Sequence, residues 1–256
     1  MTDTVLPAEP PKLRVGAVFN RAFSLLFGDF LKFFLLALLA WVPLLVALLI
    51  VGFRFARVGP NGFPGPSGVF VTGAIVVSIL TGFCVVLSQA VILYGAFERM
   101  RGKAFALGES VKRGVARVLP IFGMYILMGL AVGIGFALVI VPGLILAAMF
   151  SVALPACVVE KLGPFDSLIR SVELTKGNRW RVFGIVIVLY VANVLGQALV
   201  RFLLLAIGGP ALSGIGAFLW TVLMGAYWAI AVAVIYHDLR AAREGVDIER
   251  IAAVFD

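Results

Sequence analysis

Residues 141–160 read VPGLILAAMFSVALPACVVE, residues 161–181 read KLGPFDSLIRSVELTKGNRWR, and residues 182–191 read VFGIVIVLYV. The first and last of these segments are almost wholly apolar, whereas the middle segment carries polar and basic side chains. A helix needs roughly 20 apolar residues to cross the hydrocarbon core of a bilayer. The stretch therefore predicts two membrane helices joined by an amphipathic segment.

The composition of the whole chain agrees with this interpretation. Of its 256 residues, 62% are hydrophobic and 13% are charged, whereas an ordinary soluble domain is roughly 45–50% apolar and about 25% charged. The apolar runs are long and unbroken, unlike the short alternating segments of a membrane β-barrel. We therefore expect an all-α, polytopic membrane helical bundle.

Six apolar segments are expected to be transmembrane helices within a membrane domain that covers residues 13–240. Short uncharged turns at Pro142-Gly143 and at Gly208-Gly209-Pro210 are expected to divide the third segment from the fourth and the fifth from the sixth. A disordered cytoplasmic tail is expected at residues 1–12 and a second cytoplasmic tail at residues 241–256. The six spans are expected at about 30–53, 69–97, 119–141, 144–159, 180–207 and 211–236.

Apolar residues recur at helical spacing immediately before the first, third and fifth spans, which predicts three interfacial amphipathic helices. Within the third span, Gly129 and Gly133 form a GxxxG pair, which predicts a close approach of another helix. The three amphipathic stripes consist of Val15, Val18, Phe19, Ala22, Phe23 and Leu26, of Leu107, Val111, Val115 and Val118, and of Phe165, Leu168, Ile169 and Val172.

The distribution of basic residues predicts the orientation. With this set of spans, all of the 21 Lys and Arg residues except Arg54, Arg57 and Arg201 fall on one side. Loops rich in Lys and Arg remain in the cytoplasm. We therefore expect a multi-pass protein of the cell inner (plasma) membrane with cytoplasmic N- and C-termini. Because the basic residues lie beside membrane spans, the net charge of +8 is not interpreted as a nucleic-acid surface.

The sequence contains no recognisable catalytic constellation. His237 is its only histidine, and a zinc site needs several His, Cys or carboxylate ligands close in space. We therefore expect no enzymatic activity, no metal and no cofactor. An intramembrane enzyme that uses His237 beside Asp238 is the least favoured alternative.

A basic and aromatic cluster precedes and opens the fifth span. One interpretation is a contact for lipid headgroups, because Arg suits phosphate and Trp prefers the headgroup level. The other is topological anchoring by ordinary cytoplasmic basic residues. The residues of this cluster are Arg170, Lys176, Arg179, Trp180 and Arg181.

Asn193 and Gln197 lie one helical turn apart within the fifth span. They could line a polar path for a solute, or they could form hydrogen bonds between helices, which is the more common role of polar residues in spans. The first interpretation leads to an alternative function, that of a transporter or permease for a small or lipid-like solute.

Residues 141–185 carry a set of features that includes Pro142-Gly143, Pro155, Glu160 and Trp180-Arg181, and residues 235–250 add a characteristic ending. In these features the chain resembles the membrane domain of glycerophosphoryl diester phosphodiesterases and related stand-alone six-helix bacterial membrane proteins of unknown function. The resemblance implies a six-helix architecture and a lipid-facing supporting role. It does not imply phosphodiesterase activity, because in that family the chemistry belongs to a separate soluble domain.

The sequence thus predicts a non-catalytic protein that interacts with lipids or acts as a membrane scaffold. Its expected partners are membrane lipids, anionic ones in particular, and a further membrane protein, with no nucleic acid.

Overall fold

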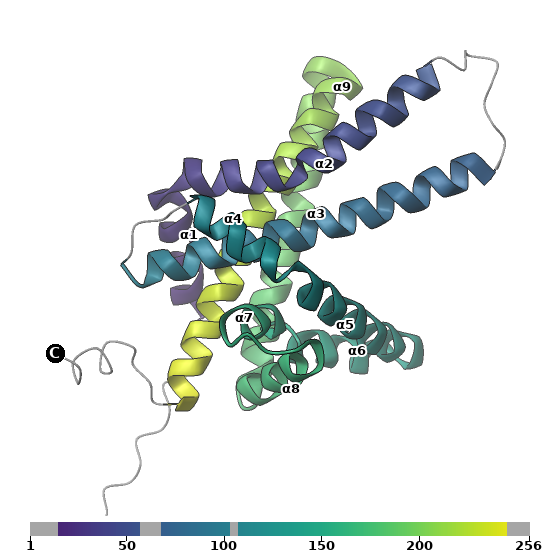
Figure 1. The fold of residues 1–256 in the computed structure, drawn as a ribbon. Helices are drawn as coiled ribbons and strands as arrows, with labels where there is room; N and C mark the ends of the chain where they lie inside the picture. The colour runs from purple at the N-terminus through teal and green to yellow at the C-terminus, as the bar shows by residue number, and fades with distance from the viewer. Residues whose placement is uncertain (1–14, 57–67, 103–106, 245–256) are drawn as a thin grey trace, which may run out of the picture. The chain divides into compact units, whose positions relative to one another are not determined.

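The computed structural model describes residues 15–56, 68–102 and 107–244, and all regular elements within these ranges are helices (Figure 1). The predicted tail at 1–12 and residues 245–256 of the predicted C-terminal tail lie outside the described residues. The helices confirm the all-α prediction. They are α1 (Val15–Gly28), α2 (Phe30–Ala56), α3 (Gly68–Met100), α4 (Leu107–Ala116), α5 (Val118–Leu138), α6 (Ile140–Met149), α7 (Ala153–Val159), α8 (Pro164–Thr175) and α9 (Arg179–Glu244).

Several of these helices have the length and composition of membrane spans. Among the described residues four segments qualify, and the number rises to five if the bent pair of α1 and the start of α2 counts as one span. The four are Ile75–Met100, Val118–Leu138, Ile140–Val159 and Arg179–Arg243. By length and composition these helices agree with the predicted membrane protein, whereas the predicted number of six spans stays a prediction.

The chain forms two compact units, which are described separately. In its described part, the first unit comprises residues 15–24, 123–194 and 231–244. The second comprises the described residues between 25 and 122 together with residues 195–230. The long helix α9 therefore contributes its two ends to the first unit and its middle to the second.

In the second unit, α2 packs along α3, and α9 turns back on itself at Gly208 and Gly209. Gly209 has a φ of 71°, a conformation that glycine adopts without steric cost. Beyond the turn, the Ser213 hydroxyl donates a hydrogen bond to the Arg201 carbonyl at 3.2 Å. This hairpin confirms the turn predicted at Gly208-Gly209-Pro210.

In the first unit, the turn between α5 and α6 lies at Val139 and not at Pro142-Gly143. Val139 is extended (φ −159°, ψ 149°), and Pro142 is the third residue of α6. The backbone N–H groups of the first helical turn have no intrahelical acceptor, so proline is tolerated there. The prediction misplaced the turn because it assigned Pro142 to a loop instead of a helix start.

The span predicted at 144–159 is divided in two, because α6 ends at Met149 and α7 begins at Ala153. Pro155 explains the division, since it also occupies the third position of its helix, and a continuous helix would require the N–H group that it lacks. Every residue of α7 from Ala153 to Val158 is buried. The predicted segment is therefore a broken helix, although Ile140–Val159 as a whole has the length and composition of a span.

The glycines that allow close packing are also different from the predicted pair. A Cβ added to Gly129 or Gly133 would meet no other described atom within 4 Å. A Cβ on Gly135 would instead lie 2.9 Å from the Gly143 Cα atom and 2.9 Å from a Leu146 methyl group. The tight approach is therefore within the α5–α6 hairpin, on the face of α5 that carries Gly135.

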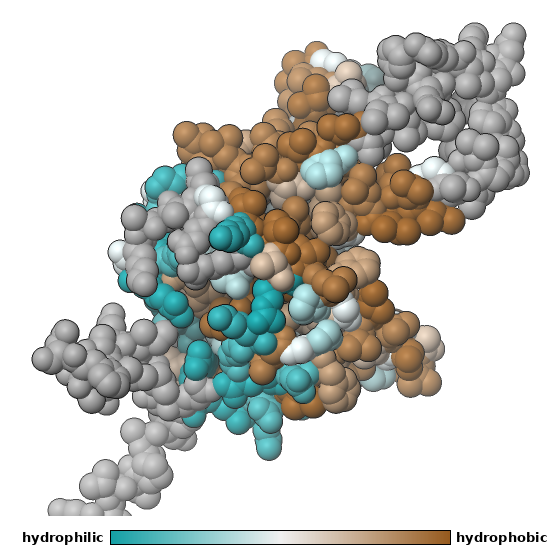
Figure 2. Space-filling model, in the orientation of Figure 1, coloured by the Kyte–Doolittle hydropathy of each residue, from teal (hydrophilic) through white to brown (hydrophobic). Residues whose placement is uncertain are grey.

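Figure 2 shows how polarity is distributed over the first unit. Hydrophobic residues cover the α5–α6 hairpin, whereas hydrophilic residues gather over α7 and α8. Such an uneven surface is typical of a protein that contacts lipid on one part and water on another.

Candidate functional site

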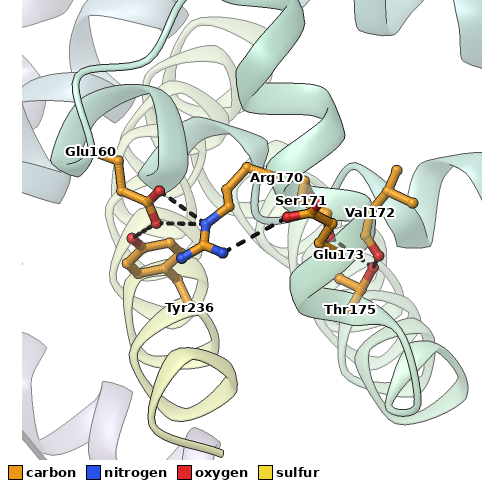
Figure 3. Close-up of polar contacts among 7 residues, drawn as sticks. All are labelled: Glu160, Arg170, Ser171, Val172, Glu173, Thr175 and Tyr236. Atoms are coloured by element: carbon orange, nitrogen blue, oxygen red, sulfur yellow. Dashed lines mark hydrogen bonds and ion pairs between the residues drawn. The ribbon is translucent and has the colours of Figure 1, made fainter. Parts of the chain in front are cut away.

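The first part of the candidate site is a carboxylate that accepts hydrogen bonds from two helices (Figure 3). Glu160 follows the end of α7, and both of its carboxylate oxygens lie within hydrogen-bond distance of the Arg170 Nε atom, at 3.0 and 2.9 Å. The Tyr236 hydroxyl, from α9, donates to the same carboxylate at 2.6 Å. These contacts join α7, α8 and the last part of α9.

Arg170 belongs to the cluster for which the sequence suggested a contact with lipid headgroups or topological anchoring, and the structure gives it a carboxylate partner. The Arg170 and Glu160 side chains retain 24% and 17% of their exposure, and Arg170 also lies 3.8 Å from the carboxylate of Glu173. Because carboxylates already neutralise its charge, Arg170 is a structural residue in this geometry. Its contact with lipid headgroups stays a prediction.

Small hydroxyl side chains fix α8 against the end of α6. The Ser171 hydroxyl donates to the Met149 carbonyl at 2.7 Å, and the Thr175 hydroxyl lies 3.4 Å from the same carbonyl. Met149 is the last residue of α6, where helix carbonyls lack intrahelical donors. The hydroxyls therefore satisfy a group that the break before α7 leaves open.

The predicted apolar stripe of α8 is divided between two faces. Leu168 is buried together with Ser167, Ser171, Leu174 and Thr175, but Phe165 is 65% exposed and Ile169 is 47% exposed. The inner face of α8 thus uses hydroxyls and leucines, and its outer face presents large apolar side chains. A helix in a membrane interface has this arrangement when its outer face contacts lipid.

A sharp turn leads from α8 to α9. Gly177 has a φ of 89°, as is common just after a helix end, and Asn178 precedes the first residue of α9. Lys176 is exposed, and its backbone carbonyl accepts a hydrogen bond from Arg243 at 2.9 Å. The Arg181 guanidinium donates to the Asn178 side chain at 3.4 Å.

The second part of the candidate site is a pocket of about 300 Å³ in the first unit. The start of α9 forms one side with Arg179, Trp180 and Phe183, and the Trp180 and Phe183 rings meet edge to face at 6.0 Å. The opposite side comes from α6 and is wholly apolar. Its residues are Val141, Leu144, Ile145 and Ala148.

Arg179 is the polar side chain of this pocket. Its Nε atom is buried, and within the described part of the chain it has no hydrogen-bond partner. A buried donor without an acceptor costs about 1–3 kcal/mol. The neighbouring Trp180 is 75% exposed, so the pocket lies next to an outward-facing aromatic ring.

The remaining predicted residues lie elsewhere. Asn193 and Gln197 are half-buried on α9, and neither lines this pocket. Their role in a solute path therefore stays a prediction. The His237 Nδ1 atom is 3.4 Å from Asp238, which also lies 3.3 Å from Arg21. Residues 15–56, 68–102 and 107–244 contain no group of three or more His, Cys, Asp or Glu side chains that could hold a metal ion.

The sequence pointed to Arg179 and Trp180 on the α9 side of the pocket, but it gave no indication of the α6 residues opposite them. The signal for the end of α6 was Pro155, which marks the start of the next helix and hence a break before it. The Glu160–Tyr236 contact had no comparable signal, because it joins residues 76 positions apart.

A family model described as Domain of unknown function (DUF7847) matches residues 68–239, from the start of α3 to the end region of α9. The comparison with curated proteins gives no match, and neither does the comparison with solved structures.

Proposed function

The chain belongs to the family of the domain of unknown function DUF7847, and from its residues we propose that it is a non-catalytic integral membrane protein that interacts with anionic lipids. The observation that carries this proposal is the start of α9, where exposed Trp180 lies between Arg179 and Arg181, with exposed Lys176 just before them. Trp favours the headgroup level, and each basic residue near an anionic surface contributes about 1 kcal/mol.

The amphipathic helices α1 and α8 each expose apolar side chains on their outer face, which supports a position for both helices at the membrane–water interface. On α8 the exposed residues include Phe165 and Ile169. On α1, Phe23 and Phe27 are exposed while Val18, Ala22 and Leu26 are buried. Large apolar side chains that the chain itself leaves uncovered gain free energy in the acyl boundary of a bilayer.

The α5–α6 hairpin enters and leaves the membrane on one side in this proposal, instead of crossing twice as the sequence suggested. The last residue of α6 accepts a hydrogen bond from α8. The 10 residues of α6 extend only about 15 Å, which is half of the roughly 30 Å hydrocarbon core. The tip of the hairpin is apolar and exposed, with Leu138 at 72%. The 21 residues of α5 are long enough to cross, so the proposal requires α5 to run obliquely. The short α6 and the exposed apolar tip then favour a tip that ends within hydrocarbon.

The orientation of the termini does not depend on this hairpin. A hairpin that returns and one that crosses twice both leave the following chain on the side where it started. The excess of Lys and Arg around α4, α8 and the end of α9 supports cytoplasmic N- and C-termini in the plasma (inner) membrane. The number of full crossings in the proposal is therefore four, made by α2, α3 and the two halves of α9.

The resemblance to the membrane domain of glycerophosphoryl diester phosphodiesterases fits a lipid-facing role, and it enters here only as support for that role. A protein partner that docks on the cytoplasmic helices belongs to the same proposal. No observation in the described residues favours the transporter alternative specifically.

Native mass spectrometry of the purified protein tests the proposal. After exposure to equal amounts of phosphatidylglycerol and phosphatidylcholine, the wild-type protein should retain phosphatidylglycerol in clear excess. A triple variant, Lys176→Gln, Arg179→Gln and Arg181→Gln, should lose most of that excess. The matched control removes three charges elsewhere, by Arg101→Gln, Lys112→Gln and Arg201→Gln, and should keep most of it. Equal retention of the two lipids by the wild type would refute the proposal.

A further inference from the structure

We propose that the pocket between α6 and the start of α9 binds one anionic phospholipid molecule, with an acyl chain against α6 and the phosphate at Arg179. This inference rests on the proposed interaction with anionic lipids and makes it specific. It replaces a diffuse attraction between charges by a site with a fixed stoichiometry.

The α6 side of the pocket has the properties of a wall for an acyl chain. Val141, Leu144, Ile145 and Ala148 carry no polar side-chain atoms and span two turns of the helix. Volumes of ligand pockets range from about 300 to 1,000 Å³, so a pocket of about 300 Å³ suits one chain segment and not a whole diacyl lipid. The headgroup and the second chain remain outside the pocket.

Arg179 supplies the polar end. Its buried Nε–H group lacks an acceptor within the described residues, and a phosphate oxygen is the acceptor that a guanidinium binds best, often through two parallel hydrogen bonds. Exposed Lys176 does not line the pocket, but it lies three residues earlier in the chain and adds positive charge before the start of α9. This arrangement favours a lipid with net negative charge over a zwitterionic lipid.

The surrounding membrane is the source of the ligand in this inference. Trp180 and Val141 border the pocket and are both more than half exposed, so a chain can enter laterally from the bilayer. With Trp180 at the headgroup level, α6 runs from Ala148 towards Val141 into the hydrocarbon. A free phosphate would use Arg179 alone and would gain nothing from the apolar wall.

A titration of the full-length, delipidated protein in an uncharged detergent tests the site. The probe is dioctanoyl phosphatidylglycerol, and native mass spectrometry counts the bound molecules. The comparison probes are dioctanoyl phosphatidylcholine, which keeps the chains but has no net charge, and inorganic phosphate, which lacks chains. One tightly bound phosphatidylglycerol is expected. Phosphatidylcholine keeps the phosphate, but its choline cation cancels the net charge and is repelled by Arg179, and inorganic phosphate lacks the acyl chain that contacts α6, so each should bind at least about tenfold more weakly.

Two pairs of variants locate the binding. Ile145→Trp fills the pocket, whereas Ile140→Trp adds the same ring to an exposed residue of α6 that does not line it. Arg179→Gln removes the proposed phosphate ligand, whereas Arg101→Gln removes an exposed charge after α3. The first member of each pair should weaken binding by about tenfold or more, and the second should leave it unchanged. Leu144→Trp serves in place of Ile145→Trp if that variant fails to fold.

The outcomes separate this inference from the proposed function. If folded Ile145→Trp and Leu144→Trp bind the single phosphatidylglycerol as well as the wild type, the pocket does not hold the chain and the inference is wrong. If inorganic phosphate competes with phosphatidylglycerol at equal concentration, the site is a phosphate site and the inference is also wrong. In either case, an excess of anionic lipid around the wild type would leave the proposed function standing.

Discussion

Glu160 is the residue on which the first unit converges, because it accepts hydrogen bonds from α8 through Arg170 and from α9 through Tyr236. A half-buried ion pair of this kind is costly to break from one side, since the remaining charge loses its partner. Its role is to hold α8 and the last part of α9 to the end of α7.

Tyr236→Phe tests this contact with little change in volume. The substitution removes one hydrogen bond to a charged acceptor and should lower the free energy of unfolding by about 1–2 kcal/mol. Thermal unfolding in detergent measures the effect. Tyr190→Phe, on the same helix but exposed, should leave the midpoint unchanged. An equal midpoint for Tyr236→Phe and the wild type would show that the hydroxyl does not stabilise the fold.

Glycine substitutions in α5 distinguish the observed packing from the packing that the GxxxG pattern predicted. Gly135→Ala places a methyl group 2.9 Å from the Gly143 backbone and should destabilise the protein by about 1–3 kcal/mol. Gly133→Ala meets open space and should be neutral or slightly stabilising, because alanine favours a helix by up to about 1 kcal/mol. Thermal unfolding of the two variants checks the order. The reverse order would support the GxxxG prediction.

Single residues were only partly predictable from the sequence. A pattern such as GxxxG marks glycines that share a helix face, but it does not say which face another helix approaches. The turn at Gly208-Gly209-Pro210 was correctly predicted, because a positive φ angle such as that of Gly209 is a local property of the backbone. Packing contacts such as Gly135 with Gly143 depend on the tertiary arrangement.

At the scale of elements, three prolines explain most of the differences between prediction and structure. Pro142, Pro155 and Pro164 each lie in the first turn of a helix. The sequence prediction placed Pro142 in a turn and Pro155 inside a span, and it therefore misplaced one turn and missed a break. The amphipathic helices α1, α4 and α8 were predicted close to their observed ranges, because hydrophobic periodicity is a local signal.

The α5–α6 hairpin gives a prediction about an element. Val139→Cys, at the tip, should resist a membrane-impermeant maleimide applied outside intact spheroplasts, because hydrocarbon surrounds the tip. Ile207→Cys, at the α9 turn, is the control and should react, because its helix is long enough to cross the membrane. Both positions are exposed on the protein itself, so protein burial does not explain a difference. Comparable labelling of the two cysteines would show that the hairpin crosses the membrane.

At the scale of the whole molecule, the class of protein was predicted from composition and charge, whereas the candidate site was found only in the three-dimensional structure. The start of α9 was visible in the sequence as a cluster of Arg179, Trp180 and Arg181. Its partner α6 was not, because α7 and α8 separate the two segments in the sequence and only the tertiary structure brings them together. The pairing of Arg170 with Glu160 was not visible for the same reason, since it depends on tertiary structure.

Lipid analysis of the protein in its own membrane tests the central claim most directly. The full-length chain is extracted in polymer-bounded discs without detergent, and the lipid classes in the discs are compared with those of the bulk membrane. The account predicts enrichment of anionic lipids around the wild type and loss of most of this enrichment in the variant that lacks Lys176, Arg179 and Arg181 charges. Discs with the same lipid composition as the bulk membrane would contradict it.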